Sequence, residues 1–172
     1  MKELFKTLRK IVGDRRFEER REFLRSLSLC KGLKERELGY LLQSFHSRIY
    51  NEGEVLFLEG DIGRALFIVE SGRVELSKIG SDDKPRRIAE LHEGAFFGEM
   101  ALLEHMPRSA SATALEKSKL LLLYRSKLDE ILYHHPKVGV SIMAHLAKLL
   151  SARLRKTSEK LASITDADPA AV

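Results

Sequence analysis

The chain has 172 residues, of which 44% are hydrophobic, enough for one domain with a substantial core. Its single cysteine, Cys30, excludes a disulfide framework and favours a buried apolar role in a reducing cytosol. No apolar stretch approaches the length of a membrane span and the N-terminus lacks the apolar core of a signal peptide, so we expect a cytoplasmic protein.

The net charge of +5 is modest, although basic residues gather near both ends of the chain. Such a distribution can attract nucleic acid or acidic lipid, but we favour the simpler interpretation of solvated helix faces.

Helical spacing dominates the chain up to about Tyr50. Residues 1–27 are predicted to form an N-terminal helical extension whose apolar positions are Leu4, Phe5, Leu8, Ile11, Val12, Phe17, Phe23, Leu24 and Leu27. We interpret these positions as packing faces. Docking of the first dozen residues to a membrane surface is the alternative.

From Tyr50 the pattern changes to short apolar runs separated by glycines. Strands are expected at residues 55–58, 66–69, 73–79, 86–91 and 120–124, with turns at Gly53, Gly60, Gly63, Gly72 and Gly94. Closely spaced short strands with glycine turns are typical of a β-sandwich or barrel. Residues 28–135 are therefore expected to form one β-rich domain.

Two helices are predicted after the last strand. Ser126 offers an N-cap for a short helix that ends near Pro136, and a long helix follows over residues 136–164. Apolar residues recur at threes and fours along that helix, which favours packing against a partner: Ile142, Leu146, Leu149, Leu150, Leu154, Leu161 and Ile164. Residues 165–172 are expected to be a flexible tail.

The segment 96–114 is the most informative in the chain, because it places one carboxylate and one guanidinium among small residues. Gly98 precedes a short helical turn whose free N–H groups can bind an anion. Beyond Pro107, Arg108 would be costly to bury without an anionic partner, whereas Glu99 suits sugar hydroxyls. A salt bridge between Glu99 and Arg108 is the simpler alternative.

In this segment Phe-Gly-Glu is followed by Ala-Leu, a short loop and Pro-Arg-Ser-Ala. The whole pattern resembles the phosphate-binding cassette of the cyclic nucleotide-binding domain family. The resemblance covers roughly residues 28–125. It implies an α+β fold, a β jelly-roll (double-stranded β-helix) barrel flanked by N-terminal helices and a long C-terminal helix.

The resemblance also implies roles for individual residues. Glu99 would accept the ribose 2′-hydroxyl, and Arg108 would bind the cyclic phosphate together with backbone N–H groups of Met100, Ala101 and Ala110. Ser109 can bond the phosphate and does not by itself choose the base. Phe97 and Gly98 complete the cassette, which we define as residues 97–110.

The long helix carries a second resemblance, in residues 153–160, to the dimer helix of the catabolite activator (Crp/Fnr-like) branch of this family. It implies that Thr157 contacts the base within its own subunit and that Ser158 reaches the site of the partner. An ordinary surface role is the alternative for both hydroxyls. Together with the cassette, Thr157 and Ser158 favour cAMP over cGMP as the ligand. They also favour a homodimer.

In that branch a winged helix-turn-helix follows the dimer helix, whereas this sequence ends at Val172. We therefore expect direct DNA binding to be unlikely, unless the chain is a fragment of a longer protein.

An enzymatic role has no support in the sequence. The six histidines include no His-x-His pair of the kind a metal-dependent barrel enzyme would need, and we expect no bound metal. The favoured interpretation is a cyclic nucleotide sensor that changes conformation and signals to an unknown protein effector. A ligand-free dimeric interaction module and a transcription-regulator fragment are the alternatives.

Overall fold

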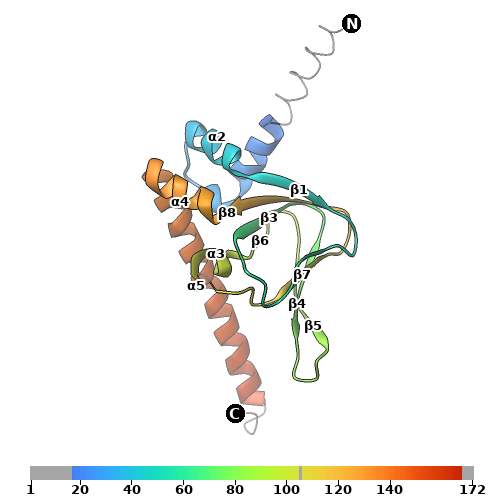
Figure 1. The fold of residues 1–172 in the computed structure, drawn as a ribbon. Helices are drawn as coiled ribbons and strands as arrows, with labels where there is room; N and C mark the ends of the chain where they lie inside the picture. The colour runs from blue at the N-terminus through green and yellow to red at the C-terminus, as the bar shows by residue number, and fades with distance from the viewer. Residues whose placement is uncertain (1–16, 105, 168–172) are drawn as a thin grey trace, which may run out of the picture.

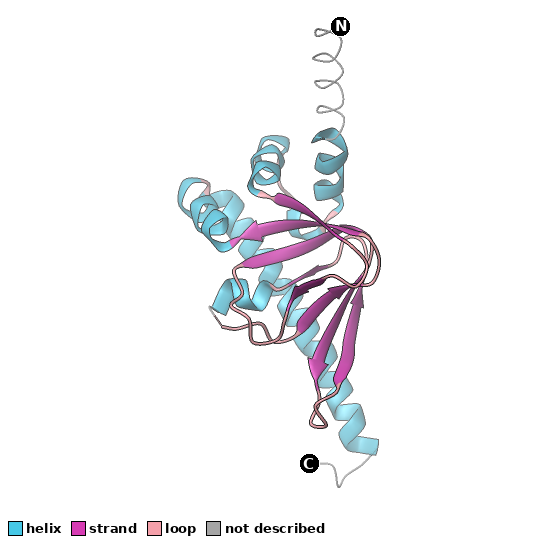
Figure 2. Cartoon of the chain, turned by 45° about the vertical axis from the view of Figure 1, so that its right-hand side comes forward, coloured by secondary structure: helices cyan, strands magenta, loops and turns pink. Residues whose placement is uncertain are grey.

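The computed structural model describes residues 17–104 and 106–167. The predicted helix before residue 17 and the end of the predicted tail after residue 167 lie outside the described residues. Within the described part, eight strands form two four-stranded antiparallel sheets in the jelly-roll arrangement that was predicted, and the helices lie on one side of the strands (Figure 2).

The first sheet has the strand order β1-β8-β3-β6, formed by β1 (His46–Tyr50), β8 (Ser118–Tyr124), β3 (Ala65–Ser71) and β6 (Phe96–Phe97). The second has the order β2-β7-β4-β5, formed by β2 (Val55–Phe57), β7 (Ser111–Ala114), β4 (Val74–Ile79) and β5 (Pro85–Leu91). The strands predicted from the glycine-punctuated runs are thus confirmed within one or two residues at most ends.

Both faces of β3 and β8 are buried, because successive side chains point to opposite faces of a strand. Leu66 and Leu121 pack among the helices, whereas Phe67 and Leu122 pack between the two sheets. Burial on both faces explains why these strands appear in the sequence as continuous apolar runs.

The N-terminal helices cover the outer face of the first sheet. They are a helix over residues 17–26, a short 3₁₀ helix η1 (Ser28–Cys30) and α2 (Glu35–Ser44). The helical prediction up to Tyr50 is wrong for His46–Tyr50. That segment is strand β1, whose pairing with β8 in register His46↔Leu122 overrides its local pattern.

Two helices follow β8. The first is α4 (Arg125–His134), and its N-cap is Tyr124 without a side-chain cap, so the predicted cap at Ser126 is wrong. Pro136 lacks the N–H that a continuing helix would need, and it instead occupies the first position of α5 (Pro136–Ala167). This helix runs three residues beyond the predicted end at residue 164.

The long helix α5 passes along the side of the molecule, close to the short helix α3 (Glu99–Glu104) and the strands (Figure 1). Its first half packs into the helical core through Val138, Ile142 and Leu146, each at most 3% exposed. The predicted packing of Ile142 and Leu146 against a partner is therefore wrong, because both are buried in the core of this chain. Its second half lines the cavity described next. No helix among the described residues is both long and apolar enough to cross a bilayer.

Candidate functional site

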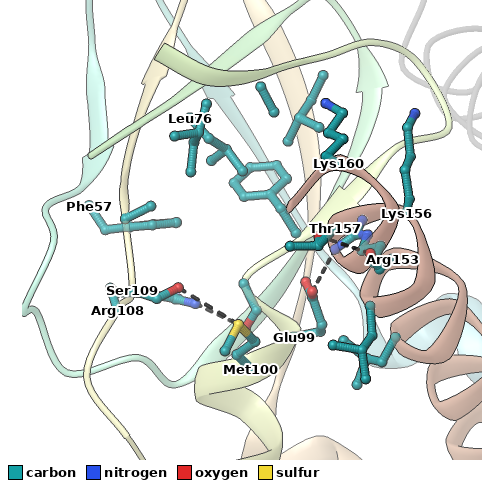
Figure 3. Close-up of a pocket in the computed structure, with 18 residues that line it drawn as sticks. Phe57, Leu76, Glu99, Met100, Arg108, Ser109, Arg153, Lys156, Thr157 and Lys160 are labelled. Atoms are coloured by element: carbon teal, nitrogen blue, oxygen red, sulfur yellow. Dashed lines mark hydrogen bonds and ion pairs between the residues drawn. The ribbon is translucent and has the colours of Figure 1, made fainter. Parts of the chain in front are cut away.

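A cavity of about 670 Å³ lies between the second sheet, the cassette and the second half of α5 (Figure 3). This is within the range of small-molecule sites, about 300–1,000 Å³. Its lining is Phe57, Leu76, Ile88, Ala89, Leu91, Phe97, Gly98, Glu99, Met100, Arg108, Ser109, Ala110, Leu150, Arg153, Leu154, Lys156, Thr157 and Lys160.

Arg108 is a buried cation on the cassette side of this cavity, with 6% of its surface exposed. Its guanidinium donates to the carbonyl oxygens of Gly98, at 3.0 Å, and Ala65, at 2.9 Å. It also lies over the Phe57 ring, 4.1 Å from the centroid. These contacts fix the plane of the guanidinium, as bidentate anion binding requires.

Among the residues that the structure describes, no carboxylate is in direct contact with Arg108. Burial lowers the pKa of Arg108, while the negative charges of Asp61 and Glu99 act in the opposite direction. Its Nε atom is buried and has no hydrogen-bond partner in the described structure. A buried guanidinium with an unused donor is the kind of group that an anionic ligand would satisfy.

Gly98 makes room for this guanidinium. Its φ of +76° is a left-handed conformation that side chains rarely adopt, and a Cβ there would lie 2.4 Å from a terminal nitrogen of Arg108. Helix α3 begins at the next residue, so the N–H groups of its first turn, which includes Met100 and Ala101, have no helical partner.

Glu99 is buried as well, at 5% exposed, and its partner is Arg153 of α5. The Arg153 guanidinium donates to Glu99 Oε1 at 2.5 Å and to the Phe96 carbonyl oxygen at 2.7 Å. The alternative of a salt bridge between Glu99 and Arg108 is therefore wrong, because a residue 54 positions away along the chain occupies that role.

The structure brings most of the predicted ligand residues together. Phe97, Gly98, Glu99, Met100, Arg108, Ser109, Ala110 and Thr157 all line the cavity. Ala101 is the next residue of α3. Ser158 is exposed on α5 and is not among the lining residues of this cavity, so its predicted role at the site of a partner subunit stays a prediction.

The Thr157 hydroxyl has a defined orientation. Its Oγ1 donates to the Arg153 carbonyl oxygen at 3.0 Å, the usual bond of a helical threonine to the preceding turn. While this bond is kept, the single hydroxyl proton is used, and Thr157 offers a ligand its acceptor lone pairs.

The other lining residues were not predicted from the sequence, and two groups of them shape the site. The apolar wall of Leu76, Ile88 and Leu91 comes from β4 and β5, and only the packing of the sheets determines which strand face meets the cavity. Arg153 is four residues before Thr157, so the two share a face of α5, and that spacing could have identified it.

The described residues contain no group of three or more His, Cys, Asp or Glu side chains that could hold a metal ion. Cys30 is 2% exposed, as predicted, and packs in the helical core away from the cavity lining.

Comparisons with known proteins agree with this geometry. The profile of the cyclic nucleotide-binding domain family matches residues 47–135. The cyclic AMP receptor protein of Thermus thermophilus is 39% identical over 134 residues, which are 77% of this chain and 60% of that protein. Mouse cGMP-dependent protein kinase 2 is 33% identical over 71% of this chain, but the match covers only 16% of the kinase.

The fold comparison gives the same result. A crystal structure of a cyclic nucleotide-binding domain from Methylobacillus flagellatus superimposes with a TM-score of 0.77 at 30% sequence identity, covering 88% of this chain and 85% of that one.

Proposed function

The chain belongs to the cyclic nucleotide-binding domain family, and from this premise we propose that it is a regulatory sensor for a cyclic nucleotide, with cAMP preferred over cGMP. The observation that carries the proposal is Arg108, a buried guanidinium with an unpartnered Nε beside a cavity of suitable size.

In the proposed complex the cyclic phosphate binds Arg108. The aromatic ring of Phe57 and the carbonyl oxygens of Gly98 and Ala65 already hold the guanidinium in place, so little ordering is needed on binding. Free N–H groups at the start of α3 and the hydroxyl of Ser109 add donors for the phosphate oxygens.

Glu99 is the proposed acceptor for the ribose 2′-hydroxyl. A carboxylate accepts several hydrogen bonds, so Glu99 can hold the ribose while Arg153 remains on Oε1. Arg153 thereby links the sugar to α5.

The preference for cAMP rests on Thr157. Its hydroxyl offers acceptor lone pairs, which complement the N6 amino group of adenine and do not complement O6 of guanine. In a homodimer Ser158 of the partner subunit would add a second hydroxyl at the base. The 39% identity to a cyclic AMP receptor supports the same choice.

Binding is proposed to bias the position of α5. The Glu99–Arg153 pair joins the cassette to α5, so a ligand that contacts both elements favours one arrangement of the helix over others. The output would pass to a partner, either the second subunit or an effector protein in the cytoplasm.

A thermal-shift panel tests this function. We expect cAMP at about 100 times its Kd to stabilise the folded state by about 2.7 kcal/mol, a rise in Tm of about 5–10 °C. Cyclic GMP should give a smaller rise, and 5′-AMP, which lacks the cyclic phosphate, the smallest. Identical melting curves with and without each nucleotide would favour the ligand-free interaction module.

A further inference from the structure

Two lysines that line the cavity, both exposed to solvent, would have no anionic partner in a complex with a cyclic mononucleotide. Among the described lining residues Arg108, Arg153, Lys156 and Lys160 are cationic, and Glu99 is the one carboxylate. In the proposed function Arg108 binds the phosphate, and Arg153 is paired with Glu99. Lys156 and Lys160 are left without an anionic group.

The two lysines are neighbours on one face of α5. At a spacing of four residues their Cβ atoms are about 5–6 Å apart, so both ammonium groups can reach one anion. Neither has an ion pair within the parts of the chain that the structure describes, and like charges at this spacing repel each other. An anion between them would relieve that repulsion.

Their position along α5 places them beyond the base. Lys160 follows Arg153 by seven residues, about 10 Å along the helix, and Thr157 lies between them. Figure 3 shows both amino groups at the side of the cavity opposite Met100 and Arg108. When a nucleotide is bound at the cassette, only a substituent that extends beyond the base of that nucleotide can therefore reach the lysines.

We infer that Lys156 and Lys160 form an anion subsite, and that the cavity takes a cyclic nucleotide carrying a second acidic group beyond its base. This rests on the proposed function. The apolar wall of Leu76, Ile88 and Leu91 would then contact the base between the two anionic ends.

A matched pair of ligands tests the subsite by calorimetry. N6-carboxymethyl-cAMP carries a carboxylate beyond the base, and N6-carbamoylmethyl-cAMP is its neutral counterpart. We expect the carboxylate to bind about three- to tenfold more tightly at low salt, and this advantage to shrink as salt is added. In the Lys156→Gln/Lys160→Gln double variant the advantage should disappear.

Lys148→Gln is the control, because Lys148 is exposed on α5 and does not line the cavity. Three results would each overturn the subsite and leave the proposed function standing. The two analogues could bind with equal affinity, the tighter binding of the carboxylate analogue could persist in the double variant, or neither analogue could bind where cAMP binds. Failure of cAMP itself to bind would overturn both.

Discussion

Glu99 and Arg153 connect two parts of the site that are far apart in the sequence. The carboxylate is 5% exposed and the guanidinium donates to it at 2.5 Å, which orients Glu99 toward the cavity that it lines. A ribose hydroxyl bound there would be recognised by a group that is already fixed in place.

This gives a prediction for Glu99→Gln. In the wild-type chain, 2′-deoxy-cAMP should bind about tenfold or more weakly than cAMP, since one hydrogen bond to a charged group is lost, worth about 1.5–3 kcal/mol. In the variant the difference between the two ligands should shrink to about threefold or less. Calorimetric titration of both ligands into both proteins measures the difference in affinity between cAMP and 2′-deoxy-cAMP. The same difference in the wild type and the variant would exclude Glu99 as the ribose acceptor.

A separate prediction concerns Cys30. Burial raises the pKa of its thiol to about 12 from an ordinary value of 9.0. The folded protein should not react with a thiol-specific reagent at pH 8, where the buried thiol stays protonated. Rapid labelling without denaturant would contradict its burial.

The sign of the pH effect follows from the same shift. Above pH 9 the unfolded chain loses the proton before the folded chain does, so this cysteine's contribution to the free energy of unfolding falls as pH rises from 9 toward 12. Chemical denaturation at several pH values measures this contribution. Between pH 9 and 12 the free energy of unfolding should fall less steeply in Cys30→Ala than in the wild type, by up to about 1.4 kcal/mol per pH unit. Parallel pH profiles of the two proteins would contradict the shift.

At the scale of elements, the close contact between α4 and α5 depends on Gly139. A Cβ there would lie 2.6 Å from Leu132 Cδ2 and 2.9 Å from Leu132 Cα. Gly139→Ala should therefore destabilise the fold by about 1–3 kcal/mol, as overpacking does. Chemical denaturation measures the change.

Gly39 provides the matched control, since it is also in a helix, α2, and a Cβ there would meet nothing within 4 Å. Gly39→Ala should stabilise the fold by up to about 1 kcal/mol, because alanine favours helix. Equal effects of the two substitutions would mean that the α4–α5 contact does not limit the size of residue 139.

The elements of this fold differ in how well the sequence predicts them. The runs at Leu66 and Leu120 are apolar enough to be predicted as strands, and Pro136 marks the start of α5. Strand β1 was missed because it is exposed at four of its five positions, and its strand character comes from pairing with β8.

The candidate site also has residues that the sequence predicts and residues that it does not. The cassette is contiguous, so its spacing reveals Glu99 and Arg108 in the sequence. The β4–β5 wall depends on how separate elements pack, and no local pattern contains that information. The spacing to Thr157 places Arg153 on the cavity face of α5, but its pairing with Glu99 depends on how α5 packs against the cassette.

At the scale of the whole molecule, we expect a homodimer through α5. Val140, Ala147 and Leu154 are exposed, seven residues apart, and so form an apolar stripe outside the core. Light scattering should give a dimer mass, and Ala147→Glu should give a monomer. Ile49→Glu, which places the same charge on exposed β1, should leave the dimer intact. A monomeric wild-type mass would contradict the dimer and remove the role of Ser158 across subunits.

The central claim is that Arg108 binds the phosphate of a cyclic nucleotide, and calorimetric titration with cAMP and cGMP tests it most directly. We predict one saturable site per chain in the wild type, tighter for cAMP. In Arg108→Gln, checked for folding by circular dichroism, affinity should fall about 100-fold, because two charge-assisted hydrogen bonds are lost. No heat with either nucleotide at millimolar concentration, or equal affinity in the variant, would contradict the claim.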